Sequence, residues 1–183
     1  MQQPGSKLAR GAFARVERHM SAAYFAHSLR TYGCAEAFAA RRKLAYDAEG
    51  LYVASLFHDV GLFPPWRDRA RPFQLVSGQF LREFLDEHKI EPARTDRLVA
   101  SIEYHMRPLP SWGRGAEVGL LHVGAWMDAV SWRRWTIGDE AAKLEAEFPR
   151  GAFLTEACRL VASAVGSPAA LFGMVMPDSF RKR

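Results

Sequence analysis

A short apolar segment that ends in two polar residues is the first feature of the sequence that could do chemistry. Residues 52–62 read YVASLFHDVGL, so His58 and Asp59 follow an apolar run and come just before Gly61. Adjacent helical residues point about 100° apart, but near the last turn of a helix two neighbouring side chains can converge on an ion. The structural alternative is a histidine that favours the helix dipole and a solvated aspartate. The His-Asp pair alone does not decide between the two.

Three more ionisable residues lie in apolar stretches elsewhere in the chain. His27 stands in YFAHSLRTY, where a buried, hydrogen-bonded histidine is the alternative to a ligand. Asp128 follows LLHVGAWM, and a carboxylate there needs either a bound cation or an arginine such as Arg30 as its partner. His105 ends the segment LVASIEYH, and we expect it to contact the site without binding the metal.

Two imidazoles and two carboxylates form a set of nitrogen and oxygen donors for one divalent metal ion. The set comprises His27, His58, Asp59 and Asp128. Such donors suit Zn²⁺, our first expectation, with Fe²⁺, Mn²⁺, Co²⁺ and Ni²⁺ as alternatives. The metal would lower the pKa of a bound water molecule towards neutrality, and Asp59 or a neighbouring side chain could relay the proton.

Helices must position these residues, because apolar residues recur at intervals of three and four and strict alternation never lasts for a strand's length. The pattern predicts an all-α fold. The expected helices cover residues 21–44, 47 to about 61, 78–89, 92–106, 117–132, 139–148 and 152–165. Asp47 and Ser77 are the expected caps of the second and third of these helices. Two proline-rich irregular segments, 63–76 and 107–114, lie between helices, and we expect the first to cover the site.

The length of 183 residues and the hydrophobic content of 49% favour one domain. We expect a helical domain over residues 21–175, with a basic N-terminal segment over 1–20 and a basic C-terminal tail over 176–183. Because the net charge of +5 lies largely in these ends, no nucleic-acid partner is expected. Cys34 and Cys158 have no CxxC partner and indicate reduced thiols.

The sequence also indicates where the protein works. Its first ten residues are polar, and it has no run of about 18 apolar residues. We therefore expect a soluble, cytoplasmic protein with a small-molecule substrate and no membrane partner. The sequence leaves a homo-oligomer open.

The order of the four candidate ligands resembles the pattern of the HD-domain superfamily, in which a His, a His-Asp pair and a distant Asp follow one another. The segments HSLRTYG, YVASLFHDVGL and LLHVGAWMDAV, with the ending IEYH between the last two, are similar to those of cyanamide hydratase-like HD proteins. The resemblance covers roughly residues 21–132. It implies an HD-domain helical bundle, a divalent metal held by His27, His58, Asp59 and Asp128, and water activation as the common chemical step.

The resemblance leaves the reaction open, because relatives cleave phosphate esters, hydrate nitriles or, in a diiron branch, oxygenate their substrates. We expect first a hydratase or small-molecule hydrolase, which would convert a nitrile to a urea or an amide. The second reading is a phosphohydrolase of nucleotides or other phosphate esters, and the third is a binding module with a non-catalytic metal. The predicted catalytic residues are Asp59, His105 and Arg30, and the predicted substrate contacts are Phe63, Trp66, Phe73, Arg107 and Trp112.

The number of metal ions can also be predicted. In the diiron branch an additional histidine follows the His-Asp pair, but no histidine lies between Asp59 and Gly78. The nearest polar side chain at that place is Gln74, a neutral amide and a poor ligand for a transition metal. His88 lies too far along the following helix. We therefore expect one metal per chain and no oxygenase chemistry, with His105 free to bind substrate or move a proton.

Overall fold

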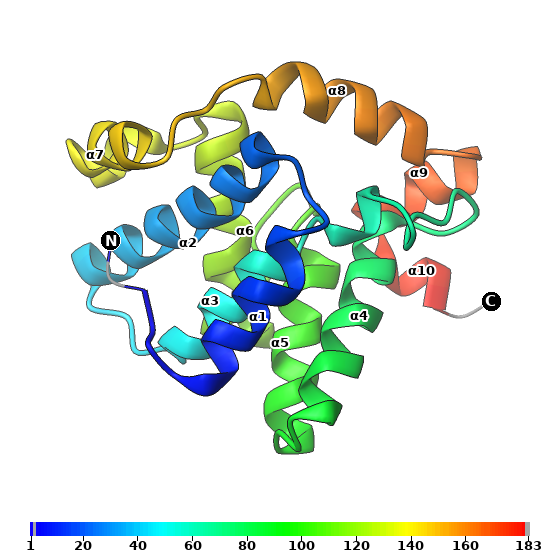
Figure 1. Ribbon diagram of the computed structural model, residues 1–183, viewed down its shortest axis with the longest axis horizontal. Helices are drawn as coiled ribbons and strands as arrows, with labels where there is room; N and C mark the ends of the chain where they lie inside the picture. Colours follow the sequence, from blue (N-terminus) through cyan, green and yellow to red (C-terminus); the bar gives the residue numbers. More distant parts are fainter. Residues whose placement is uncertain (2, 182–183) are drawn as a thin grey trace.

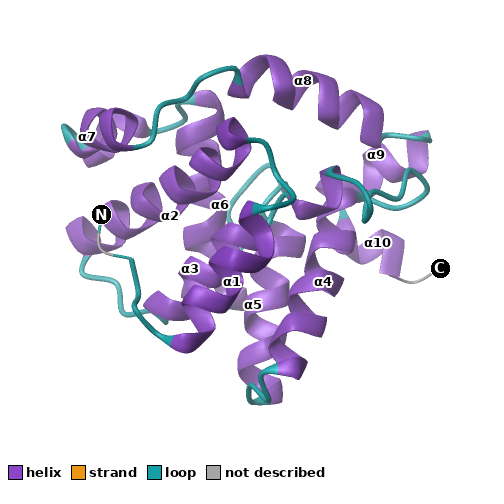
Figure 2. Cartoon of the chain, viewed as in Figure 1, coloured by secondary structure: helices purple, strands orange, loops and turns teal. Residues whose placement is uncertain are grey.

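The chain folds as a bundle of helices in the computed structural model, which describes residues 1 and 3–181 (Figure 1). The elements are α1 (Lys7–Glu17), α2 (Ala22–Arg42), α3 (Ala48–Phe57), η1 (Val60–Leu62), α4 (Phe73–Glu87), α5 (Pro92–Tyr104), η2 (Trp112–Arg114), α6 (Ala116–Val130), η3 (Arg134–Ile137), α7 (Glu140–Glu147), α8 (Phe153–Ala164), α9 (Pro168–Val175) and α10 (Pro177–Arg181). The described residues form helices and loops and no strand (Figure 2). The predicted all-α class is confirmed.

The central helix pair of the bundle is α2 and α6, with α3 and α5 packed against it. A glycine lets this pair approach closely. A Cβ atom added at Gly124 of α6 would lie 2.2 Å from the carbonyl oxygen of Thr31 in α2, so a larger residue would force the two backbones apart. The close approach brings His27 of α2 within hydrogen-bond distance of Asp128 of α6.

Side-chain caps start two of the helices that carry the site. Ser21 and Asp47 each accept a backbone N–H from the first turn of α2 and α3, as predicted for Asp47. The predicted cap at Ser77 is wrong, because α4 begins at Phe73, directly after the last proline of the loop. Ser77 lies inside that helix, and its hydroxyl oxygen accepts the N–H of Gly61 at 2.9 Å. This bond ties α4 to the turn that follows the His-Asp pair.

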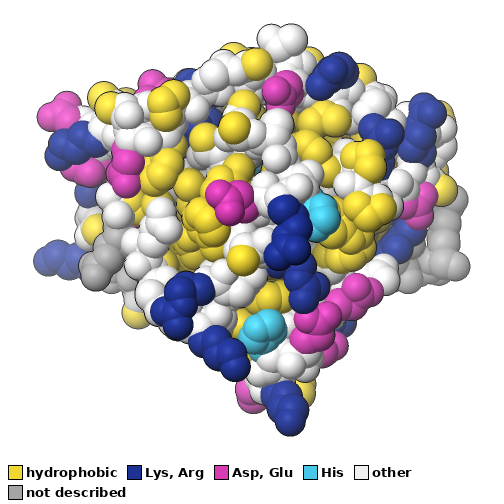
Figure 3. All heavy atoms as spheres, in the orientation of Figure 1, with side chains coloured by type: hydrophobic (Ala, Val, Ile, Leu, Met, Phe, Trp, Pro, Cys, Tyr) yellow, Lys and Arg dark blue, Asp and Glu magenta, His cyan; other side chains and the backbone are white. Residues whose placement is uncertain are grey.

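The two ends of the chain contribute more structure than the sequence indicated. Within the predicted basic segment 1–20, α1 buries Leu8, Ala9, Ala12 and Val16 and packs against α3. The predicted tail over 176–183 includes α10, while residues 182–183 lie outside the described part. No helix of the described residues has both the length and the apolar character needed to cross a membrane. On the face in Figure 3, basic side chains lie in separate groups with acidic and apolar side chains between them.

Candidate metal centre

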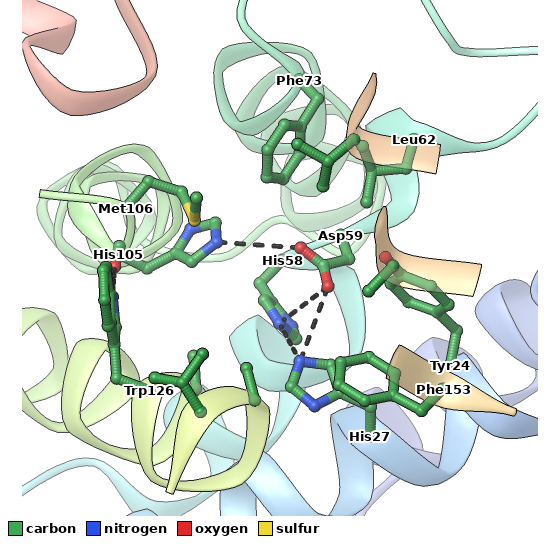
Figure 4. A pocket seen from close by; sticks show the side chains of 15 residues that line it. Tyr24, His27, His58, Asp59, Leu62, Phe73, His105, Met106, Trp126 and Phe153 are labelled. Carbon is green, nitrogen blue, oxygen red and sulfur yellow. Dashed lines mark hydrogen bonds and ion pairs between the residues drawn. The ribbon is translucent and has the colours of Figure 1, made fainter. Parts of the chain in front are cut away.

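Three predicted ligands meet where α2 passes the end of α3. His27 comes from the second turn of α2, His58 ends α3, and Asp59 follows it. The Nε2 atoms of His27 and His58 are 3.2 Å apart, and Oδ2 of Asp59 lies 3.2 Å from Nε2 of His58 and 3.6 Å from Nε2 of His27 (Figure 4). All three side chains are buried, and their ligand atoms lie within 4.8 Å of one another.

Backbone carbonyl groups fix the proton positions of two histidines. Nδ1 of His58 lies 2.7 Å from the carbonyl oxygen of Ser55, and Nδ1 of His105 lies 2.6 Å from that of Ile102. A carbonyl oxygen only accepts, so both Nδ1 atoms must donate, and a neutral ring then has its lone pair on Nε2. Both Nε2 atoms are directed toward Asp59 (Figure 4).

Asp128 does not join these ligand atoms, because it lies on the opposite edge of the His27 ring. Its Oδ2 accepts from Nδ1 of His27 at 2.6 Å and from Nη2 of Arg30 at 2.9 Å. Its Oδ1 accepts from Nε of Arg30 at 2.7 Å and from Nη1 of Arg150 at 3.3 Å. Four donors use the lone-pair positions of a carboxylate. The structure thus gives Asp128 the arginine partner that was the structural alternative, and the carboxylate orients His27.

The donor chemistry of the three meeting residues fits a divalent metal. His27 donates its Nδ1 proton to Asp128, so its Nε2 also presents a lone pair to Nε2 of His58. Two lone pairs and a carboxylate oxygen converge in a buried space, which is an arrangement that a cation stabilises. Burial alone would raise the pKa of Asp59, but the surrounding imidazoles, His58 foremost, hold it well below its usual range when they carry a proton, and Asp59 in turn raises the pKa of His58 against the effect of burial. A bound metal ion would take the place of that proton. The carboxylate is therefore ionised and available as a ligand.

His105 faces the Oδ1 atom of Asp59, whereas the two ligand histidines face Oδ2 (Figure 4). Its Nε2 is 3.7 Å from Oδ1 of Asp59, and its backbone carbonyl accepts the indole N–H of Trp126 at 2.9 Å. Burial, together with the nearby His58, lowers the pKa of His105 to about 3. The ring is therefore neutral near pH 7, and its Nε2 lone pair is available to accept a hydrogen bond.

A cavity of about 150 Å³ adjoins the cluster. Its lining residues are Tyr24, His27, His58, Asp59, Leu62, Phe73, His105, Met106, Ala125, Trp126, Ala129, Val130, Phe153, Ala157 and Val161. The cluster forms the polar part of the lining, and helices α6 and α8 contribute apolar walls. Val130 lines the cavity and is 61% exposed, so the cavity reaches the surface at the end of α6.

Tyr24 is a lining residue that the sequence analysis missed. It lies three residues before His27, so both side chains project from one face of α2. Among the described residues its hydroxyl has no hydrogen-bond partner, although its ring packs edge-on against Phe63 and Phe153. Its position one turn before a predicted ligand was the available signal. The hydroxyl is free to hydrogen-bond a molecule in the cavity.

Of the predicted substrate contacts, Phe73 lines the cavity and the other four do not. Phe63 packs behind Tyr24, with 5.1 Å between ring centroids. Trp66 lies against Phe80 at 4.9 Å and lines a different hollow beside α1 and α4. The loop after η1 therefore anchors itself to the core through its aromatic residues, and α8 supplies the wall assigned to this loop.

The remaining predicted contacts also lie elsewhere. Arg107 stacks over the ring of Tyr104, and Trp112 stacks on Phe38 with 40% of its surface exposed. Arg30, predicted to act on substrate, is fully buried. Besides its two bonds to Asp128, it donates to the carbonyl oxygens of residues 148 and 149. Arg30 does not line the cavity, and its donors hold the carboxylate of Asp128 and the backbone before α8.

Comparison with models of protein families identifies the family of this chain. The family model described as "HD domain" matches residues 24–162, which include every candidate ligand. The match covers well over half of the chain and extends into α8. A search of curated proteins found no match.

Proposed function

Because the chain belongs to the HD domain family, we propose that it is a metal-dependent enzyme that adds water to a small, uncharged molecule, as in the hydration of a nitrile. The family consists in general of metal-dependent hydrolases, and a donor set for a divalent ion is present. The observation that carries the finer proposal is the cavity beside this donor set. No Lys or Arg is among the residues that line it.

His27, His58 and Asp59 would hold the metal, with Zn²⁺ as the first expectation from the nitrogen and oxygen donors. When bound, such a metal supplies a water molecule of lowered pKa and polarises a substrate atom next to it. Asp128 keeps the His27 ring in the required orientation and tautomer. The apolar walls exclude bulk water, which strengthens the electrostatic interactions inside the site.

The chain's residues account for the proton movements of a hydration. The oxygen of water bonds to the nitrile carbon, one electron pair of the triple bond moves to nitrogen, and nitrogen takes up a proton. The resulting imidic acid becomes the amide when its hydroxyl proton moves to nitrogen. His105, whose Nε2 lone pair faces Asp59 at the cavity, can accept the proton of water and return it to nitrogen. The reaction requires no oxidant and no reactant besides the nitrile and water.

The alternative of a phosphohydrolase lacks protein cations at the cavity. Phosphate oxygens are commonly held by arginine or lysine. Arg30 is committed to Asp128, Arg107 stacks on Tyr104, and the side chain of Arg67 bonds to Ser163 at an exposed position. The negative charge of a phosphate ester would therefore be neutralised by the metal ion alone. This placement favours an uncharged substrate.

The test is turnover of cyanamide, simple nitriles and nucleotide monophosphates by the metal-loaded protein. We expect amide or urea from the nitriles and no phosphate release. The variant His58→Ala should lose both metal and turnover, whereas His88→Ala, which changes a histidine outside the site, should keep both. Phosphate release without nitrile hydration would refute the proposal, and so would full activity of metal-free His58→Ala.

A further inference from the structure

From the shape and chemistry of the cavity we infer that the substrate carries an apolar body about the size of a benzene ring, and that this body lies between α6 and α8. The inference rests on the proposed function, because it concerns the rest of the molecule whose reacting group meets the metal. An aromatic or branched aliphatic nitrile is the chemical class that it names.

The first argument is the separation of polar and apolar groups within the cavity. His27, His58, Asp59 and His105 lie together in the lining (Figure 4), and the hydroxyl of Tyr24 lies beside them. The remaining lining side chains are aliphatic or aromatic, apart from a thioether and an indole N–H that already bonds to the carbonyl of residue 105. A ligand that fills this space thus needs a polar head at the cluster and an apolar remainder.

The second argument is size. The cavity measures about 150 Å³. An engineered apolar cavity of this volume in another protein holds a benzene molecule, so this space can take a body of about that size. Cyanamide has no carbon atom beyond the nitrile carbon, so it would leave the apolar walls without contacts. A substrate with an apolar body would fill them and gain dispersion and hydrophobic energy.

The third argument is the wall formed by α8. Phe153 stacks on the ring of His27 at 4.2 Å between centroids, and Ala157 and Val161 follow one and two turns later on the same face. Opposite them, α6 contributes the small side chains Ala125 and Ala129. The alanines leave the space between the two helices open. An apolar body placed there would meet aliphatic groups on both sides and Phe153 at its inner end.

The experiment measures binding to the metal-free protein, so that it does not depend on turnover. Benzonitrile is the probe, and ligand-observed NMR gives its Kd. Ala157→Leu places an isopropyl group in the cavity, whereas Ala162→Leu makes the same change at an exposed position of α8. We expect Ala162→Leu to bind as the wild type does and Ala157→Leu to bind about tenfold more weakly. Val161→Phe is a second blocking variant if Ala157→Leu does not fold.

Equal binding by the blocked and control variants, or no binding of benzonitrile by the wild type, would overturn the inference. Turnover by the metal-loaded wild type then separates the two proposals. Hydration of cyanamide but not of benzonitrile contradicts the apolar body and leaves the proposed function standing. Release of phosphate from phenyl phosphate, with no nitrile hydrated, contradicts the proposed function. In that case the binding of benzonitrile to the blocked and control variants still decides whether the cavity holds an apolar body.

Discussion

Replacing Asp128 by asparagine tests whether this carboxylate positions His27 or binds the metal itself. In the structure its two oxygens accept four hydrogen bonds, from His27, Arg30 and Arg150. An asparagine keeps the size of the side chain but replaces one acceptor oxygen by an NH₂ donor. That donor would face N–H groups of its neighbours, and the buried guanidinium of Arg30 would lose its counter-charge.

The magnitude follows from burial. Asp128 is 2% exposed and Arg30 is 0% exposed, so the pair belongs to the buried class. Removing one partner of a buried ion pair costs about 3–5 kcal/mol. This is a large part of the roughly 5–15 kcal/mol by which small proteins are stable. Loss of an outer partner of a metal-binding histidine weakens metal binding by roughly 10–100-fold, so we expect weakened and not abolished binding.

The assay is urea unfolding of the metal-free proteins, followed by metal titration against a competing chelator. Glu145→Gln is the matched control, because Glu145 also accepts a bond from Arg150 but is partly exposed and should matter by less than about 1 kcal/mol. If Asp128 is a ligand instead, metal-free Asp128→Asn should be as stable as the wild type and should bind no metal. That pair of results would refute the positioning role.

Three further changes test other parts of the site. Tyr24→Phe should lower turnover while the melting temperature stays within a few degrees, because the hydroxyl has no partner among the described residues; equal turnover would exclude it as a substrate contact. Burial lowers the pKa of His122 to about 4, so its neutral form stabilises the fold above pH 6.5 and this contribution is lost as pH falls towards 4. Between pH 7 and pH 5 the free energy of unfolding should therefore fall by about 2 kcal/mol less in His122→Phe than in the wild type. The same fall in both proteins would contradict the lowered pKa of His122. Trp66→Ala should cost about 3 kcal/mol of stability and leave KM unchanged, and a raised KM in a stable variant would return Trp66 to the site.

The sequence was informative where local patterns determine structure. Helical periodicity predicted the helices that carry the site, and the placement of His58 and Asp59 at the end of an apolar helix indicated their convergence. Such features depend on a few neighbouring residues. The helix α1 was missed because its charged residues obscure a narrow apolar face, Leu8 to Val16.

Contacts between distant parts of the chain could not be predicted in the same way. No local pattern shows that Trp66 packs against Phe80. Nor does one show that α8, and not the loop between η1 and α4, forms a wall of the cavity. The sequence could not decide the partner of Asp128 for the same reason, because a metal cation and an arginine can both neutralise a buried carboxylate. Only the close packing of α2 on α6 at Gly124 decides which of them is in reach.

The histidines of the site differ in what holds their second nitrogen, and this difference affects how the protein tolerates mutation. His58 and His105 bond to backbone carbonyl groups three residues earlier, at the ends of their own helices. Every residue type provides that carbonyl, so drift in the sequence around them leaves both tautomers in place. His27 depends on a side chain, Asp128, which itself depends on Arg30. Mutational damage to the metal centre should therefore concentrate at this one pair, outside the ligand atoms.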